Sequence, residues 1–241
     1  MAVKASTTAG KVLAGLDAVA RNQPVGVSEL ARFLAEDKAM VQRMLVTLAE
    51  EGWIKPEGER RTKWSVTHRL RLLADIACAD SDIITIARPV LEALRDETGE
   101  TVSLVLNDAA RFIVADVAES DAMLRAVPRV GMEVPAPISA SSLAYMPFLP
   151  VGRQAAIIGR PPTASDEEML EEVRKAGFAM RESHRNDETV SIASAVRDKS
   201  REPLAVIVVT APQSRLSPMK CETLGKAVHK AAGEISIQMC G

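Results

Sequence analysis

The sequence predicts an α+β fold in two parts: a small helical unit that ends in a β-hairpin, and a larger unit with a mostly antiparallel sheet flanked by helices. Three observations support this prediction. Apolar residues recur with helical spacing through residues 8–51, they alternate along several stretches after residue 100, and helical spacing returns around those stretches. At 241 residues, 47% of them hydrophobic, the chain is long enough to bury a core in each part.

Three helices are expected first. They cover Thr8–Arg21, Glu29–Ala35 after a cap at Ser28, and a stretch that begins after a cap at Asp37 and ends at Gly52. The apolar face of the third helix is formed by Val41, Met44, Leu45 and Leu48. Its opposite side is predicted to carry Lys38, Met40, Gln42, Arg43 and Thr47. The third helix is therefore amphipathic, with a mixed polar face toward solvent.

A β-hairpin is predicted directly after the third helix. Trp53–Pro56 and Trp64–Val66 flank a charged, turn-rich stretch, and the basic residues at or near its tip are Arg60, Arg61 and Lys63. Two short helices followed by a basic hairpin are typical of a winged helix-turn-helix, which we assign to residues 1–66.

This unit predicts a protein that binds double-stranded DNA. The outward residues of the third helix suit phosphates and base edges in a major groove, and the basic hairpin suits the sugar-phosphate backbone or a minor groove. The alternative is that the hairpin charges are only solvated. Residues 1–70 hold 11 Lys and Arg against 8 Asp and Glu, while the remainder of the chain is acidic, so the basic end is the candidate for DNA.

Residues 67–80 are predicted to form a linker helix. Leu70, Leu73 and Ile76 share one face that no other part of the sequence obviously covers, so this helix is a candidate dimer contact. One recognition helix covers only half of an operator, which also favours a homodimer.

The second unit is predicted at residues 81–241. Its first helix begins at Ser81 or Asp82 and ends near Gly99. A capping box of Ser165 and Glu168 opens a later helix. The last helix begins at Ser217-Pro218, and the predicted strands are Thr101–Leu106, Arg111–Val117, Glu188–Val196 and Leu204–Thr210.

Several classes of protein are not expected. No stretch approaches the roughly 18 apolar residues of a membrane helix, and the N-terminus lacks the apolar core of a signal peptide, so we expect a cytoplasmic protein without a membrane partner. The scattered cysteines and histidines predict no disulfide framework, metal site or cofactor. The cysteines are Cys78, Cys221 and Cys240.

An enzyme is not expected either. The chain contains no nucleophile elbow, glycine-rich phosphate loop or zinc-ligand spacing. The small-residue loop with Ser139, Ser141 and Ser142 and the single candidate base His184 make a poor constellation for a hydrolase. We therefore predict no catalytic residues.

The order of motifs resembles the IclR family of bacterial transcriptional regulators across the whole chain. The resemblance is carried by the run Val41-x-Arg43-x-Leu45-x-x-Leu48-x-x-Glu51-Gly52, by Glu97–Val102, by Gly131-x-x-Val134-Pro135, by Gly177-Phe178 and by Arg201–Ala205. It implies a winged helix-turn-helix joined by a helix to a GAF-like domain that senses a metabolite, working as a dimer or a dimer of dimers. The effector is not implied, because Pro137–Leu143 departs from the usual pattern, and the operator is not implied, because Ala39-Met40 stands where a Ser-Thr pair is common in the recognition helix.

The resemblance also implies an effector cavity over the sheet. By spacing, it maps to the Ala140-Ser141 loop, the segment after Gly177, and the strands with Ser191 and Thr210, with Met123 or Leu124 closing the apolar side. Arg181 stands where an acidic residue is common, with His184 three residues on. A guanidinium at the mouth favours a small organic acid with an apolar or aromatic body. The alternatives are a neutral ligand, or an assembly module that binds no ligand.

Overall fold

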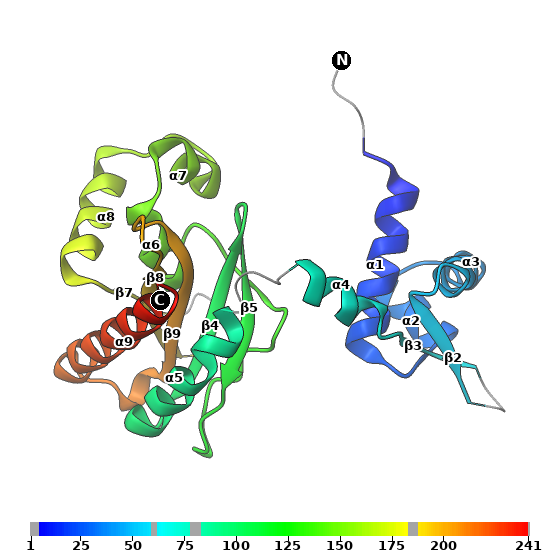
Figure 1. Ribbon diagram of the computed structural model, residues 1–241, viewed down its shortest axis with the longest axis horizontal. Coiled ribbons are helices and arrows are strands. Elements are labelled where there is room, and N and C mark those ends of the chain that lie inside the picture. Colours follow the sequence, from blue (N-terminus) through cyan, green and yellow to red (C-terminus); the bar gives the residue numbers. More distant parts are fainter. Residues whose placement is uncertain (1–4, 59–61, 78–82, 183–187, 241) are drawn as a thin grey trace. The chain divides into compact units, whose positions relative to one another are not determined.

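The computed structural model describes residues 5–58, 62–77, 83–182 and 188–240. The chain divides into two compact units, Met1–Asp80 and Ser81–Gly241 (Figure 1). Among the described helices, none is long and apolar enough to cross a membrane.

The first unit packs three helices against a small antiparallel sheet. The helices are α1 (Thr7–Asn22), α2 (Val27–Leu34) and α3 (Lys38–Glu50), and the sheet has the order β1 (Val25–Gly26), β3 (Lys63–Val66), β2 (Ile54–Glu57). Its core contains the buried side chains Val19, Leu30, Val41, Leu45, Ile54 and Trp64. A further helix, α4 (Arg69–Ala77), follows the sheet. The predicted helices and hairpin are present, with ends shifted by a few residues.

The predicted cap of α2 at Ser28 is wrong. The cap is Gly26, whose N–H donates to the Glu29 carboxylate at 3.2 Å, and Ser28 lies inside the helix. The reason is that Val25 and Gly26 pair with β3, so the chain is extended up to Gly26 and turns into the helix immediately afterwards.

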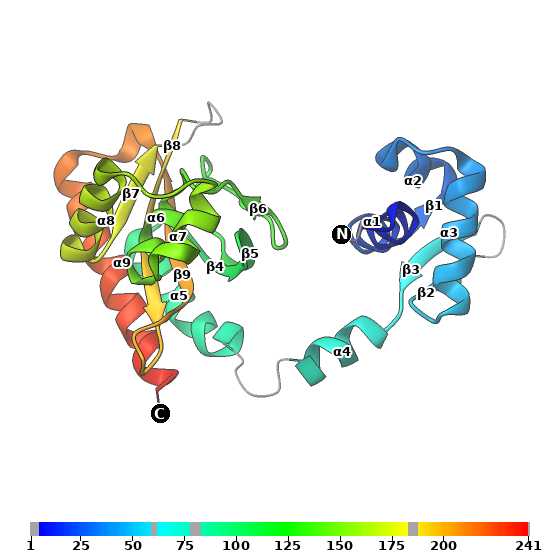
Figure 2. The ribbon, with the colours of Figure 1, turned by 90° about the horizontal axis from the view of Figure 1, so that it is seen from above.

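The second unit is a six-stranded antiparallel sheet covered on both faces, which confirms the predicted α+β class. The strand order is β6 (Glu133–Val134), β5 (Arg111–Ala118), β4 (Thr101–Asp108), β9 (Pro203–Pro212), β8 (Thr189–Arg197), β7 (Ala179–Glu182). Helices α5 (Ile83–Thr98) and α9 (Pro218–Gln238) bury one apolar layer against it. On the other face lie α6 (Ala140–Tyr145), α7 (Val151–Ile158) and α8 (Ala164–Ala176), seen in front of the sheet in Figure 2.

The predicted loop at Ser139–Ser142 is instead the start of helix α6. The Ser139 hydroxyl caps it by accepting the Ser142 N–H at 3.2 Å, and all six helical residues are buried. A helix this short shows no apolar period, and burial on every side favours small residues, so the sequence pattern looked like a loop.

The predicted capping box of α8 is displaced by two residues. Thr163 and Asp166 form it, not Ser165 and Glu168, and Asp166 is fixed further by an ion pair with Arg160 at 2.6 Å. Both pairs fit the same pattern, and the extra ion pair favours the earlier one. The caps at Asp37 and Ser217 are confirmed, while Ser81 and Asp82 lie outside the described residues.

Candidate DNA surface and effector cavity

Helix α3 presents a defined outer face. The Asp37 carboxylate accepts the N–H groups of Ala39 at 2.8 Å and Met40 at 3.0 Å, and these two bonds hold the pKa of Asp37 below its ordinary value. Four apolar side chains then anchor the helix in the core: Val41, Met44, Leu45 and Leu48. Helix α3 is therefore capped at its start and fixed to the core on one side, with the other side to solvent.

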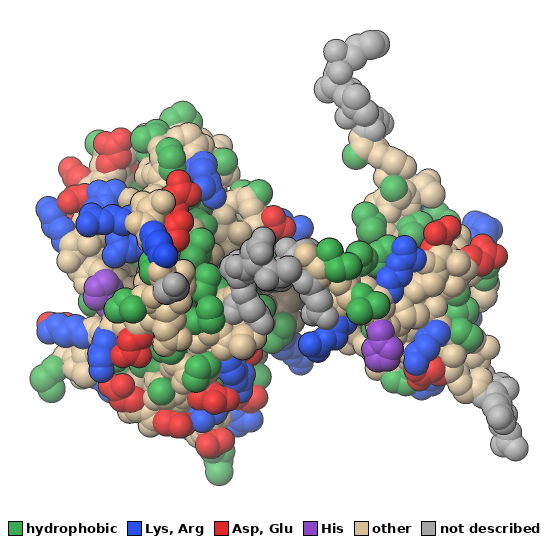
Figure 3. All heavy atoms as spheres, viewed as in Figure 1, with side chains coloured by type: hydrophobic (Ala, Val, Ile, Leu, Met, Phe, Trp, Pro, Cys, Tyr) green, Lys and Arg blue, Asp and Glu red, His purple; other side chains and the backbone are tan. Residues whose placement is uncertain are grey.

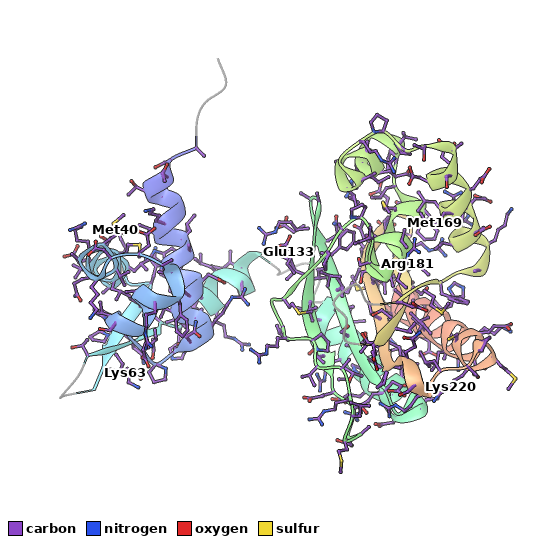
Figure 4. The ribbon with its side chains drawn as sticks, turned by 180° about the vertical axis from the view of Figure 1, so that it is seen from behind. Met40, Lys63, Glu133, Met169, Arg181 and Lys220 are labelled. Carbon is purple, nitrogen blue, oxygen red and sulfur yellow. The ribbon has the colours of Figure 1, made fainter. Side chains whose placement is uncertain are left out.

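The structure places most of the predicted DNA-contact residues on that outer side. Lys38, Gln42, Arg43 and Thr47 are exposed. Met40 is only half-buried beside them, and its Sδ lies 3.9 Å from an Arg43 guanidinium nitrogen (Figure 4). The sequence pattern missed Ala39 and Val46, which are also exposed, because small and apolar side chains are normally assigned to the core.

The hairpin that follows α3 is anchored in the core near its base and becomes exposed toward its tip. Trp64 and Ser65 of β3 are buried, while Lys63 at the start of the strand is exposed. The other two predicted wing residues, Arg60 and Arg61, lie outside the described residues.

Helix α4 is joined to the end of α3 by one side chain. The Arg69 guanidinium stacks over the Trp53 ring at 4.4 Å and donates to the Glu51 carbonyl. Beyond this joint, hydrophobic side chains lie at the surface over α4 (Figure 3): Leu72 (61% exposed), Leu73 (44%) and Ile76 (74%). Leu70, predicted on the same face, is half-buried, and Leu72 takes its place in the exposed set.

A cavity of about 480 Å³ lies over the sheet of the second unit, on the face that carries α6. Most of the predicted effector residues line it: Leu124, Ala140, Ser141, Arg181, Ser191 and Thr210. Met123 does not line it, because its side chain is fully exposed and the neighbouring Leu124 faces the cavity instead. Lining residues that the sequence pattern missed include Ser103, Arg125, Val127, Met132, Ile138 and Val208.

A polar row crosses the sheet at one end of this cavity. Arg181 pairs with Ser191, Ser191 with Thr210, and Thr210 with Thr101, so these four side chains share one face of four neighbouring strands. The Ser191 and Thr210 hydroxyls lie 3.3 Å apart. Arg181 at the edge reaches toward α8, where its guanidinium is 3.2 Å from the Met169 sulfur (Figure 4). His184 lies outside the described residues.

One wall of the cavity is the segment 119–130, which we call the wall segment. Its residues Leu124, Ala126 and Val127 line the cavity. The Thr101 hydroxyl holds it at two points, donating to the Ala126 carbonyl at 2.8 Å and accepting the Ser120 N–H at 3.2 Å. The wall segment is therefore bonded directly to the polar row.

An ion pair between the partly exposed Arg215 and the buried Glu100 holds the same segment from another side. Arg215 donates to the Leu124 carbonyl at 2.5 Å and lies 3.1 Å from the carboxylate of Glu100, which is 2% exposed. Burial raises the pKa of Glu100, and the nearby positive charge of Arg215 opposes that rise. The pair was not foreseen, because its two members are far apart in the sequence.

A serine–histidine pair elsewhere in the unit does not have the arrangement of a hydrolase. Ser194 Oγ is 3.2 Å from His229 Nδ1, but the serine is buried and donates its proton to the Gly177 carbonyl at 2.7 Å. The ring nitrogen must then donate to Ser194, so it is not a base for it. In the described part of the chain, no three metal-ligating side chains are clustered, and Cys221 and Cys240 are free thiols.

Comparison with known proteins links both units to one family. The IclR helix-turn-helix domain matches residues 8–58, and the bacterial transcriptional regulator IclR C-terminal domain matches residues 76–237. The acetate operon repressor of Salmonella typhimurium is 24% identical over 235 residues, covering 91% of this chain and 85% of the repressor. The transcriptional regulator KdgR of Escherichia coli is 25% identical over 240 residues, covering 95% of this chain and 91% of KdgR.

Solved structures show the same fold. The IclR protein of Thermotoga maritima has a TM-score of 0.72 at 22% identity and covers 96% of this chain and 98% of its own. An IclR homologue from Microbacterium hydrocarbonoxydans, complexed with 4-hydroxybenzoate, has a TM-score of 0.76 at 16% identity and covers 97% and 99%.

Proposed function

Because the chain belongs to the IclR family of bacterial transcriptional regulators, we propose that a small organic acid controls its binding to operator DNA. It is a DNA-binding regulator and not an enzyme. The controlling ligand, its site and the oligomer are our proposals. We place the protein in the cytoplasm, where the operator is.

The cavity over the sheet is the observation that carries this proposal. Its volume of about 480 Å³ falls in the range of small-molecule sites, and its lining combines an apolar wall with a few polar groups. The polar row offers the Ser191 and Thr210 hydroxyls, and Arg181 stands at its edge. A guanidinium that turns from Met169 toward the cavity would bind a carboxylate through two parallel hydrogen bonds.

The apolar wall favours an acid with an apolar or aromatic body. Val105, Val114, Leu124, Val127 and Ile138 form much of that wall. A homologue of the same fold was crystallised with 4-hydroxybenzoate, an acid of this kind, which supports the class of ligand. The alternative function for the second unit is an assembly module without a ligand.

We propose that the active form is a homodimer or a dimer of dimers bound to double-stranded operator DNA. Two recognition helices placed about one helical turn apart are needed to read a two-fold site. The predicted contacts are Lys38, Met40, Gln42, Arg43 and Thr47 on α3 and Arg60, Arg61 and Lys63 on the wing.

Calorimetry tests the effector proposal. Aliphatic and aromatic carboxylates and their neutral amides are titrated into the parent protein, Arg181→Ala and Lys226→Ala, which removes a positive charge from α9 outside the cavity. We expect an acid to bind more tightly than its amide, and this preference to disappear in Arg181→Ala alone. Equal binding of acid and amide in every protein eliminates the proposal that Arg181 binds a carboxylate. If no compound binds, the remaining function for the second unit is an assembly module without a ligand.

A further inference from the structure

The centre of the outer face of α3 includes Arg43, but its other residues are not those that the polar pattern predicts. The four buried side chains define the inner side, and at 3.6 residues per turn the positions directly opposite them are Ala39, Arg43, Val46 and Glu50. All four are exposed. Gln42 and Thr47 flank this line on its two sides, while Lys38 and Met40 lie nearer the border of the core.

Val46 is the unexplained member of this line. Its side chain is 40% exposed although a polar residue would serve equally well on a solvated helix face. It lies one turn after Arg43, and the two point in the same direction. Val46 is therefore an apolar side chain that the outer face of α3 offers to a binding partner.

The major groove of DNA offers one prominent apolar group, the C5-methyl of thymine. We propose that Val46 contacts a thymine methyl in each operator half-site and that Arg43 binds the neighbouring base pair. Side chains one turn apart on a helix in the groove reach successive base pairs. This inference rests on α3 being the recognition helix, and it makes Val46 a specificity-determining residue.

The test uses the full chain and begins with the operator. Selection from a random double-stranded library yields the preferred sequence, and each thymine in it is then replaced by deoxyuridine, which removes only the methyl group. We expect the parent protein to lose about fourfold in affinity at one thymine per half-site, equivalent to one buried methyl of ~0.8 kcal/mol. In Val46→Ala the same replacement has no effect.

Two controls make the result specific. Val151→Ala truncates an exposed valine (61%) on α7 and keeps the full deoxyuridine effect. The position at which Arg43→Ala relaxes sequence preference lies within one or two base pairs of the sensitive thymine. If Val46→Ala is folded and shows the same deoxyuridine losses as the parent, or if Val46→Ala changes only the oligomeric state, the proposal is overturned. Failure to select any sequence overturns the recognition role of α3 itself.

Discussion

Gly225 of α9 lies directly against the ring of Phe178, so closely that a Cβ at Gly225 would stand 2.4 Å from two ring carbons. Gly177, which comes directly before Phe178, has φ of +81° and faces the ring of His229. A Cβ added at Gly177 would lie 2.7 Å from the nearest atoms of that ring. Residues 225 and 229 are one helical turn apart, so the turn into β7 docks on α9 at two adjacent points. The Gly177-Phe178 motif is thus explained by the close packing of the start of β7 against α9.

We expect Gly225→Ala to destabilise the second unit. The added methyl would overlap the end of the Phe178 ring, so the ring has to shift, and such overpacking lowers the free energy of unfolding by roughly 1–3 kcal/mol. Gly233→Ala on the same helix is the matched control, because nothing lies within 4 Å of its added Cβ, and it should stabilise by about 0.5–1 kcal/mol.

Urea unfolding followed by circular dichroism measures both variants. Trp53 and Trp64 are the two tryptophans of the chain and lie in the first unit, so tryptophan fluorescence reports that unit separately. Its transition should be unchanged. Equal stability of Gly225→Ala and the parent contradicts the packing argument.

The sequence predicted best those helices whose conformation depends on their own residues. Long amphipathic segments such as α1, α3 and α9 carry their period within their own residues, so their ends were off by only a few positions. The short strands β6 and β7 and the helix α6 were missed, because their conformation depends on pairing and burial against distant segments. For the same reason the cavity residues Ser191 and Thr210 were found by resemblance, while the Glu100–Arg215 pair was not found at all.

Arg43→Ala should weaken operator binding. Loss of one specific contact to a base weakens binding by about 1–3 kcal/mol and relaxes sequence preference at that position.

Lys63→Ala on the wing removes a predicted phosphate contact instead. It should therefore weaken binding to all sequences alike and reduce the steepness of the plot of log K against log salt by about 0.9. Fluorescence anisotropy over a salt series separates the two effects. A folded Arg43→Ala protein with the parent's affinity rules out the recognition-helix assignment.

The stability of the first unit should fall in acid because of Asp37. Hydrogen bonds from Ala39 and Met40 lower its pKa in the folded state, so it stabilises α3 above the pKa of the unfolded chain and loses this contribution as pH falls through the folded pKa. The loss therefore begins below about pH 4. Asp37→Asn retains a capping side chain without a titrating group, and its tryptophan-monitored unfolding should depend less on pH there. Identical pH profiles would exclude this role.

Ile76→Lys should reduce dimer formation. This side chain is 74% exposed at the end of the apolar face of α4, and burying a lysine in the proposed contact is unfavourable. Ile237→Lys on α9 is the control, because Ile237 is exposed to the same degree (73%) outside the proposed contact. Light scattering at micromolar concentration and operator binding should change together in Ile76→Lys only. A monomeric parent protein with full operator affinity would disprove the dimer.

Thr101→Val should loosen the wall segment of the cavity. Thr101 is almost fully buried, and its hydroxyl is the partner of both the Ser120 N–H and the Ala126 carbonyl. A methyl in its place leaves the buried Ser120 N–H unpaired, at about 1–3 kcal/mol, and also removes the part-buried bond to Ala126. We expect faster hydrogen exchange at the Ser120 amide and weaker binding of the acid found by calorimetry, since Ala126 and its neighbours line the cavity.

The matched control for this change is Thr223→Val. The Thr223 hydroxyl donates to the Met219 carbonyl at 3.0 Å on the exposed side of α9, where water replaces the lost bond. It should alter neither the exchange of Ser120 nor ligand affinity. If exchange accelerates in Thr101→Val while ligand affinity is unchanged, the wall segment is held by Thr101 but takes no part in binding. If exchange is also unchanged, the Arg215 contact with Leu124 holds the wall segment by itself.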